Sequence, residues 1–315
     1  MRIVAALGGN ALLQRGERPD AAIQLNHVRR SARSIAELVE AGHEVVVTHG
    51  NGPQIGLLAV ESETDPALTA PYPLDVLGAQ TQGMIGTLLA RELRGRLPGK
   101  AVAALVTHTE VDPHDPAFTH PAKFIGQPLT DRQAQRLSRE LGWTTAADGR
   151  DRRRVVPSPE PVAVLEAPLV RQLLGSGTLV ICAGGGGVPV VHDRDTGRIT
   201  GVEAVVDKDR TAALLAEQLD ADALLILTDV THVFTGFGSA HPRPLLTATP
   251  GWLRGLDLPE GSMRPKAEAA ASFVERTGGL AAIGPVDNAL GILLGTTGTA
   301  VRAAVPAGAP SHHAA

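Results

Sequence analysis

Short apolar runs alternate with amphipathic stretches along most of this chain, and that alternation limits the folds it can adopt. Residues 3–7 form a continuous apolar run, as expected for a strand that is covered on both faces. Apolar residues between 21 and 41 recur at helical spacing, and Gly42 then provides a suitable helix end. Strands that alternate with helices in this way are typical of a parallel sheet with crossover helices. We therefore expect an α/β fold with an open, mostly parallel sheet.

The same pattern predicts further elements as far as residue 304. Strands are expected at 44–48, 101–106, 179–183, 223–228, 280–283 and 299–304, and helices at 77–93, 209–219 and 265–278. The region 107–155 breaks this rhythm because it is rich in proline, histidine and charge. We interpret it as an inserted lid, with a solvated surface excursion as the alternative. The tail 306–315 is small and polar, and we expect it to be disordered.

The composition argues against several classes of protein. The chain has 29 Lys and Arg against 33 Asp and Glu, a formal charge of −4, whereas nucleic-acid binders usually carry a basic excess. The one cysteine, Cys182, excludes a disulfide framework and fits a reduced cytoplasmic protein. No apolar run is long enough to span a bilayer. We therefore expect a cytoplasmic protein that binds neither nucleic acid nor a membrane.

Three glycine clusters each follow a predicted strand. They are Gly8-Gly9-Asn10, Gly50-Asn51-Gly52 and the run of glycines at 184–187. In an open α/β sheet, ligands bind beyond the carboxyl ends of the strands, where glycine lets backbone N–H groups approach an anion. A single cluster of this kind is often only a tight turn. Three of them, two with asparagine, predict a site for an anion or a phosphate.

The standard nucleotide-binding motifs are absent from the sequence. There is no G-x-x-x-x-G-K-[ST] motif, so the chain is not a P-loop kinase. There is also no G-x-G-x-x-G between the first strand and the first helix, which weakens the case for a dinucleotide-linked oxidoreductase. Phosphoryl transfer without a P-loop still needs positive charge around the oxygens of the transferred group.

Lysine is scarce in this chain, which uses arginine for most of its positive charge, and three lysines have unusual positions. Lys208 lies between Asp207 and Asp209 where a helix begins, and Lys266 lies at the start of another helix. Lys123 lies in the insertion. Each lysine taken alone is more typical of a solvated surface residue, and Asp209 could equally be a plain helix N-cap. Together the three could supply flexible ammonium groups that follow a phosphoryl group as it moves.

These features lie within longer stretches that run from the first strand to about Val301. The stretches are Ala6-Leu7-Gly8-Gly9-Asn10-Ala11, His49-Gly50-Asn51-Gly52-Pro53-Gln54, Thr81-Gln82-Gly83-Met84-Ile85-Gly86, Val155-Val156-Pro157-Ser158-Pro159, residues 184–189, residues 201–209 and Gly261-Ser262-Met263-Arg264-Pro265-Lys266. Together they resemble the carbamate kinases, a branch of the amino-acid kinase family.

The resemblance implies a three-layer α/β/α sandwich of the amino-acid kinase type, with a small protruding lid. Residues 1–205 would form the lobe for the phosphoryl acceptor, with the lid inserted at about 107–155, and residues 206–305 would bind the nucleotide. The implied reaction is ATP + carbamate = ADP + carbamoyl phosphate, with Mg²⁺ carried by the nucleotide and no metal site formed by the protein itself. A homodimer and a role in arginine metabolism are also implied. Because carbamoyl phosphate is a high-energy mixed anhydride, we expect the reaction to run towards ATP synthesis.

The resemblance also assigns roles to individual residues. Lys208 and Lys266 would neutralise charge, Asp209 would orient them, and Lys123 would close over the site from the lid. Residues implied to hold carbamate or the transferred phosphoryl group are Gly8, Gly9, Asn10, Gly50, Asn51, Gly52, Gly185 and Gly186. Residues implied to bind the nucleotide are Lys208, Thr228, Asp229, Phe234, Met263, Pro265 and Lys266.

Ala6 distinguishes this chain from acetylglutamate kinases and similar enzymes, which resemble one another in having a lysine two residues before the first glycine pair. Lys123 is the natural replacement for that cation, and both features favour carbamate kinase over a related kinase for another carboxylate or a phosphate. A non-catalytic ligand sensor is a third interpretation, which the retained lysines disfavour. The chain departs from the family near Ser239, where a lysine is usual, and at Phe234, where tyrosine is frequent.

Overall fold

The main sheet is built around β1 (Arg2–Leu7), in which residues 3–7 are fully buried. The computed structural model describes residues 1–14, 16–239, 241–259 and 261–304, so the tail predicted to be disordered lies outside the described residues. Within them, the main sheet has eight strands in the order β15-β17-β16-β12-β1-β2-β9-β3. Every neighbouring pair is parallel except β16 with β17. The predicted open, mostly parallel sheet is confirmed.

The strands of this sheet lie close to the predicted ranges, except β15, which the sequence did not predict. Their bounds are β2 (Glu44–His49), β3 (Val102–Ala104), β9 (Leu179–Ile181), β12 (Ala223–Thr228), β15 (Thr247–Ala248), β16 (Leu280–Pro285) and β17 (Thr299–Val301).

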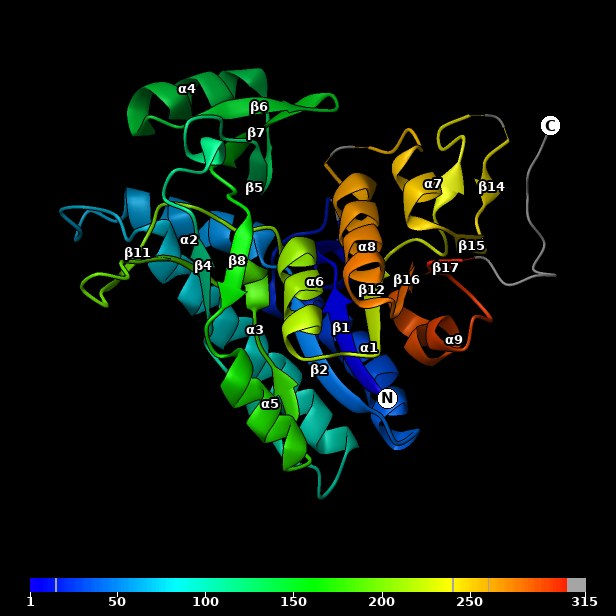
Figure 1. Ribbon diagram of the computed structural model, residues 1–315. Helices are drawn as coiled ribbons and strands as arrows, with labels where there is room; N and C mark the ends of the chain where they lie inside the picture. Colours follow the sequence, from blue (N-terminus) through cyan, green and yellow to red (C-terminus); the bar gives the residue numbers. More distant parts are fainter. Residues whose placement is uncertain (15, 240, 260, 305–315) are drawn as a thin grey trace.

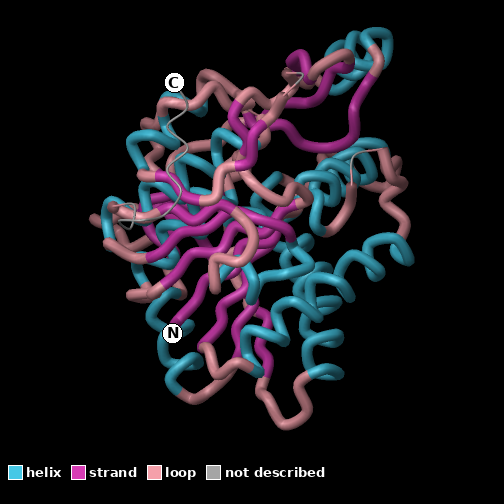
Figure 2. The backbone as a smooth tube through the Cα atoms, turned by 90° about the vertical axis from the view of Figure 1, so that its right-hand side faces the viewer, coloured by secondary structure: helices cyan, strands magenta, loops and turns pink. Residues whose placement is uncertain are grey.

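Helices cover both faces of the main sheet (Figures 1 and 2). Alternate side chains of β1 enter opposite layers, because successive residues of a strand face opposite ways: Val4 joins one core cluster and Ile3 the other. One face is covered by α5 (Ala167–Gly175), α6 (Lys208–Gln218), α7 (Pro250–Arg254) and α8 (Met263–Thr277). The other face is covered by α1 (Ala21–Glu40), α3 (Leu74–Arg96) and α9 (Ala289–Leu293). The predicted three-layer α/β/α sandwich is confirmed.

A smaller sheet adjoins the main one. Its order is β11 (Ile199–Gly201), β10 (Val188–His192), β4 (His108–Val111) and β8 (Pro161–Val164). β4 lies inside the region 107–155 that the sequence assigned to the insertion. Just before β4, the Thr107 backbone N–H donates to the Gln82 side chain of α3 at 3.1 Å. The first residues of the predicted insertion therefore belong to the body of the protein.

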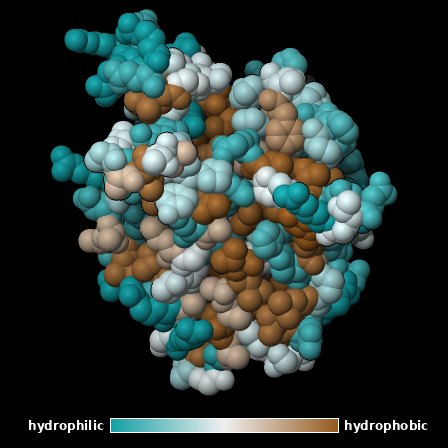
Figure 3. Space-filling model, turned by 90° about the vertical axis from the view of Figure 1, so that its left-hand side faces the viewer, coloured by the Kyte–Doolittle hydropathy of each residue, from teal (hydrophilic) through white to brown (hydrophobic). Residues whose placement is uncertain are grey.

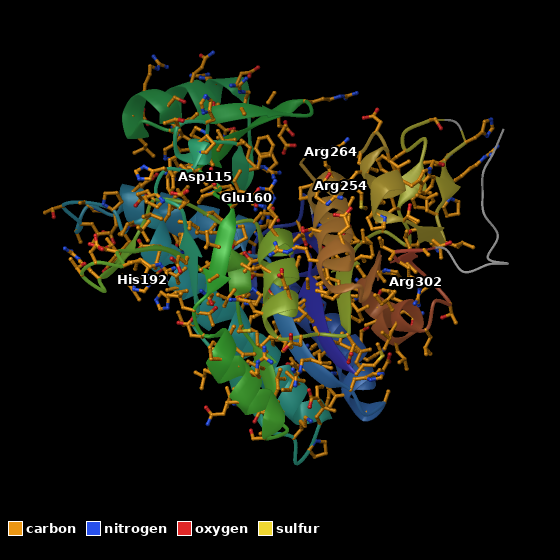
Figure 4. The ribbon with its side chains drawn as sticks, viewed as in Figure 1. Asp115, Glu160, His192, Arg254, Arg264 and Arg302 are labelled. Carbon is orange, nitrogen blue, oxygen red and sulfur yellow. The ribbon has the colours of Figure 1, made fainter. Side chains whose placement is uncertain are left out.

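The rest of that region forms a subdomain that protrudes at the top of Figure 1. It consists of β5 (Lys123–Leu129), α4 (Asp131–Leu141), β6 (Thr145–Asp148) and β7 (Asp151–Val156), with the sheet order β5-β7-β6. Thr130 and Gln133 form a capping box at the start of α4, and Gly142 ends the helix with a left-handed φ of 68°. At the base of the subdomain, the Glu160 N–H donates to Asp115 Oδ2 at 2.9 Å, and Figure 4 shows these residues side by side.

The subdomain packs against α2 (Gly52–Thr64), a helix that the sequence did not predict. Gly56 and Gly126 let the two backbones meet, since a Cβ atom on Gly56 would lie only 2.0 Å from the Gly126 Cα. Farther along α2, the Glu63 carboxylate accepts hydrogen bonds from Trp143 Nε1 at 2.6 Å and from Arg154 at 2.9 Å. This packing fixes the subdomain over one end of the main sheet.

The remaining described elements are short. They are the hairpin of β13 (Phe234–Thr235) and β14 (Arg243–Pro244), and the 3-10 turns η1 (Gly9–Ala11), η2 (Pro116–Phe118), η3 (Gly184–Gly186) and η4 (Val286–Asn288). Among the described helices, none combines the length and the apolar character that crossing a membrane would require.

Candidate active site

A cleft of about 630 Å³ lies between the carboxyl ends of the central strands, the protruding subdomain and the first turns of α6 and α8. Most of the residues predicted for the site line this one cleft. They are Gly8, Gly9, Gly50, Asn51, Gly52, Lys123, Gly185, Lys208, Asp209, Thr228, Asp229, Phe234, Met263, Pro265 and Lys266. Gly186 is not among the described residues that line it, and the side chain of Asn10 lies outside the described part of the structure.

The first two glycine turns meet at the floor of the cleft. The backbone N–H of Gly8 donates to the Leu227 carbonyl at 2.8 Å, and that of Gly50 donates to the Leu7 carbonyl at 3.0 Å. These two N–H groups therefore extend the sheet. A Cβ atom on Gly50 would lie 2.9 Å from the backbone nitrogen of Gly9, so only glycine permits this approach.

The third glycine turn packs against Asn51. Gly185 has a positive φ of 66°, and a Cβ atom there would lie 2.1 Å from Asn51 Nδ2. That nitrogen donates to Thr81 Oγ1 at 2.8 Å, which fixes the orientation of the amide. The carbonyl of Gly186 accepts a hydrogen bond from Thr109 Oγ1 at 2.7 Å. The geometry thus gives Gly185 a place in the cleft wall and Gly186 a place behind it.

Two lysines from different helices share one carboxylate. Lys208 Nζ lies 2.5 Å from Asp209 Oδ1, and Lys266 Nζ lies 3.1 Å from Asp209 Oδ2. Burial lowers the pKa of Lys208 to about 8, against the opposing effect of Asp209. Burial favours a raised pKa for Asp209, but the two lysine charges outweigh it and the pKa of this carboxyl is lowered. Burial also opposes the charge of Lys266, yet Asp209 keeps its pKa raised.

Asp207 connects this group to the protruding subdomain. Its Oδ1 accepts hydrogen bonds from the backbone N–H groups of Asp209 at 2.9 Å and Arg210 at 3.2 Å. Asp207 is therefore the N-cap of α6, a position that the sequence had offered to Asp209. Its other oxygen accepts a hydrogen bond from Lys123 Nζ across the cleft. Burial opposes ionisation of Asp207, but the charge of Lys123 outweighs it and lowers the pKa of this carboxyl.

The other end of the cleft combines apolar and polar groups. Phe234, Met263 and Pro265 line it together with Leu258. The Thr228 hydroxyl at the end of β12 donates to Asp229 Oδ1 at 3.0 Å. An apolar wall beside a hydroxyl and a carboxylate suits a flat ring joined to a polar group.

Ser239 lies in the β13–β14 loop, outside the described lining of the cleft. Its Oγ accepts a hydrogen bond from the His241 backbone N–H at 3.3 Å. Phe237, two residues earlier, does line the cleft although its side chain is 64% exposed. The effect of the missing lysine at this loop stays a prediction.

Three residues in or beside the site were not predicted from the sequence: His49, and Arg153 and Asp148 of the subdomain. His49 is buried, and burial lowers its pKa to about 4. Its neutral ring donates from Nδ1 to the Gly50 carbonyl at 3.0 Å, and its place before Gly50 in a matching stretch was the available signal. Arg153 and Asp148 line the cleft, but in the sequence they belong to a charged run typical of a solvated surface.

The amino acid kinase family model matches residues 1–283 of the chain. The carbamate kinase of Rhizobium meliloti is 45% identical over 303 residues, which are 96% of this chain and 93% of that protein. The carbamate kinase of Haemophilus influenzae is also 45% identical, over 302 residues and 96% of each chain. These matches span nearly the full length on both sides.

Solved structures give the same picture. Carbamate kinase from Giardia lamblia bound to citric acid has a TM-score of 0.88 and 35% identity, covering 96% of this chain and 98% of that chain. The same enzyme bound to AMP-PNP has a TM-score of 0.84, with equal coverage and identity. An N-acetylglutamate synthase from Neisseria gonorrhoeae, at 18% identity, a TM-score of 0.55 and coverage of 96% of this chain and 62% of that chain, shares the fold.

Proposed function

The chain belongs to the amino acid kinase family, and from that membership we infer that it catalyses the carbamate kinase reaction, ATP + carbamate = ADP + carbamoyl phosphate. It is a phosphotransferase whose acceptor is a carboxylate-like anion. The relatives named carbamate kinases are 45% identical over nearly the whole chain, which supports the same chemistry here. The direction of ATP synthesis is the one we propose, because carbamoyl phosphate is a mixed anhydride that releases free energy on transfer.

One observation carries the choice of acceptor class: the two carboxylates beside the central lysines are held ionised. Asp209 contacts Lys208 and Lys266, and Asp207 contacts Lys123, so the pKa of each carboxyl is lowered. A carboxylate held in this way is a poor general base. An alcohol acceptor would need such a base, whereas carbamate already has a negatively charged oxygen. The site therefore suits an acceptor that is an anion before it reacts.

In the synthetic direction, a terminal oxygen of ADP attacks the phosphorus of carbamoyl phosphate. The bond from that phosphorus to the carbamate oxygen breaks, and carbamate leaves with the electron pair, so no proton moves. Negative charge on the transferred group needs fixed positive partners during this step. We propose that Lys208 and Lys266 are those partners and that Asp209 is the residue that positions both ammonium groups.

We propose that the glycine turns hold carbamate and the phosphoryl group being transferred. This role is supported by the way Gly8, Gly9, Gly50 and Gly52 converge on the cleft without side chains. Because the N–H groups of Gly8 and Gly50 already bond to carbonyls, the donors to an anion are expected from Gly9 and the residues that follow Gly50. Lys123 would leave Asp207 and contact the substrate when both substrates are bound, which would exclude water during transfer.

We propose that Mg²⁺ enters with the nucleotide. Among the described residues, no three histidine, cysteine, aspartate or glutamate side chains are grouped as they would be around a metal ion. Mg²⁺ commonly keeps several waters and binds through substrate phosphates, with only one or two carboxylates from the protein. Asp229 lines the nucleotide end of the cleft and is the carboxylate we expect to lie nearest to it. When bound, the ion would neutralise phosphate charge.

We also propose that the protein is a homodimer, acts in the cytoplasm and serves arginine metabolism. The dimer is supported by an apolar surface on the side formed by α2 and α3, shown in Figure 3. Five large side chains on or near these helices are between 36% and 51% exposed, namely Leu57, Val60, Tyr72, Val76 and Met84. Apolar side chains that gather on one exposed surface are typical of a contact with another protein. Sedimentation velocity on the full chain and on Met84→Glu tests this assignment.

A panel of acceptors tests the proposed function. With ATP and Mg²⁺, we expect carbamate to be phosphorylated faster than acetylglutamate, aspartate or acetate, because the relatives that match nearly the full chain are carbamate kinases. Faster phosphorylation of acetylglutamate or aspartate would instead support the related kinase that acts on another carboxylate. Nucleotide binding without turnover of any acceptor would support a ligand sensor.

A further inference from the structure

The protruding subdomain carries a second cation that lines the cleft, Arg153 on β7. Its Nη2 lies 2.9 Å from Asp148 Oδ2, and both side chains line the cleft. Its guanidinium carbon lies 5.8 Å from the centre of the Phe124 ring. The side chain is only 21% exposed, so it is held in place between Asp148 and Phe124. Arg153 is therefore a positioned cation and is less exposed than Arg136 of α4, whose side chain is 61% exposed.

The pairing of β5 with β7 determines which way these side chains face. Val155 lies opposite Phe124 in the sheet, and Arg153, two residues before Val155, shares its face. Lys123 precedes Phe124, so it faces the opposite way, where it contacts Asp207. Of the cations on this three-stranded sheet, Lys123 and Arg153 line the cleft, and they lie on opposite faces of the sheet. Each of the two therefore meets a different part of the cleft.

The face with Phe124 and Arg153 lies beside the start of α8. A Cβ atom on Gly261 would lie 3.6 Å from the Phe124 ring, so the ring contacts the loop that leads into the helix. Met263 and Lys266, in the first turn of α8, line the same cleft. Figure 4 shows Arg264 at this end of α8, across from the subdomain. Arg153 consequently lies above the nucleotide end of the cleft.

The charge of the subdomain fits an anionic ligand. Residues 119–156 contain eight Lys and Arg against four Asp and Glu, whereas the whole chain has 29 against 33. The protruding part is therefore basic on an otherwise acidic protein. A basic surface at the mouth of a cleft raises the local concentration of anions.

We propose that Arg153 binds the phosphate chain of the nucleotide and exchanges the Asp148 carboxylate for phosphate oxygens when the nucleotide enters. The guanidinium group suits this exchange because its planar fork fits carboxylate and phosphate equally well. The inference rests on the proposed function, since it takes the ligand to be a nucleotide. It gives the subdomain two separate tasks, with Lys123 on the transferred group and Arg153 on the nucleotide.

Calorimetric titration of the full chain with ADP tests the proposal. In Arg153→Met the stem still packs on Phe124 while the charge is lost, and we expect ADP binding about five- to tenfold weaker at low salt. The difference should shrink at high salt, where partly exposed charges are screened. Arg153→Lys should recover part of the affinity. Asp148→Asn should tighten ADP binding about twofold, because ADP no longer competes with a carboxylate.

Arg136→Met is the matched control. Arg136 belongs to the same subdomain but is 61% exposed and pairs only loosely with Glu140, at 3.7 Å. The Arg136→Met substitution removes the same charge at a position outside the cleft, so ADP affinity should change by less than about twofold. Thermal unfolding of each variant checks that it is folded, and Arg153→Gln, which also removes the charge, replaces Arg153→Met if the latter is not. Unchanged ADP affinity in a folded Arg153→Met or Arg153→Gln variant would overturn the proposal, as would equal weakening in Arg136→Met.

Turnover separates this proposal from the proposed function. If the wild-type protein makes ATP from carbamoyl phosphate and Arg153→Met binds ADP as tightly as the wild type, the proposed function stands and the proposed role of Arg153 is wrong. If ADP binding depends on Arg153 but the wild-type protein transfers no phosphoryl group from carbamoyl phosphate, the role of Arg153 as a nucleotide ligand stands and the proposed function is wrong.

Discussion

Lys208 and Lys266 lie on the two oxygens of one carboxylate, that of Asp209, at 2.5 Å and 3.1 Å. The lysines come from the first turns of α6 and α8, which are more than fifty residues apart in the sequence. A single aspartate thus sets the distance between two ammonium groups before any substrate binds. Groups that are fixed in advance need no reorganisation during the reaction, which is the main source of electrostatic catalysis.

We predict that Lys208→Ala and Lys266→Ala each lower kcat by about 10²-fold or more. Each change removes a fixed positive charge that acts on the transferred phosphoryl group more strongly in the transition state than in the ground state. Steady-state kinetics with ADP and carbamoyl phosphate measure the effect. Lys100→Ala, in the turn before β3 and outside the cleft lining, is the control and should keep the wild-type kcat. An effect confined to KM would remove the lysine concerned from the catalytic group.

We predict that Lys123→Ala reduces turnover but leaves ADP affinity nearly unchanged. Lys123 contacts Asp207 from the side of the subdomain that faces away from Arg153, so its loss should affect the transferred group and spare the nucleotide. Steady-state kinetics and calorimetric titration on the same preparation measure the turnover and the ADP affinity. Wild-type turnover in this variant would mean that Lys123 does not act on the transferred group.

A comparison of Asp207→Ala with Asp207→Asn should separate the two contacts of Asp207. Both variants lose the ion pair with Lys123, but asparagine keeps an oxygen that can accept from the first N–H groups of α6. Because loss of an N-cap costs about 1 kcal/mol, we expect the alanine variant to be less stable by about that amount. Urea unfolding measures the free energy of unfolding of both variants. Equal free energies of unfolding would show that Asp207 does not stabilise α6 as a cap.

Binding of ADP should take up a proton at pH 9 but little at pH 7. Burial lowers the pKa of Lys208 to about 8 in the ligand-free protein, so its amine is mostly neutral at pH 9 and mostly charged at pH 7. An anion beside this amine raises its pKa, so the complex holds a proton that the free protein had lost. Affinity should therefore fall as pH rises above about 8. Calorimetry in buffers of different ionisation enthalpy measures the uptake, and its absence at pH 9 would contradict the lowered pKa.

The sequence predicted the sheet and the position of the cleft, because both follow from local patterns. Buried parallel strands are recognisable as apolar runs, and the turns after β1, β2 and β9 must meet at one edge of the sheet. The glycines at these turns therefore predicted the position of the cleft correctly. Helix α2 was missed because it begins with Gly52 and Pro53, which are typical of a loop, although proline fits the first turn of a helix.

The subdomain contacts could not be predicted in the same way. The bond between Lys123 and Asp207 joins residues 84 positions apart, and it depends on how the subdomain packs against α2. The place of Arg153 depends on the register of β5 with β7, which no local pattern specifies. In the sequence, Arg153 is one of several consecutive arginines and nothing separates it from its neighbours. The family resemblance gave Lys123 its role over the site but gave no information on Arg153.

The most direct test of the account is the formation of ATP from ADP and carbamoyl phosphate with Mg²⁺, followed by phosphorus NMR. We predict one ATP for each carbamoyl phosphate consumed above its spontaneous breakdown, and loss of this activity in the Lys208→Ala and Lys266→Ala variants. A wild-type protein that forms no ATP above the background would contradict the account, as would full activity in either lysine variant.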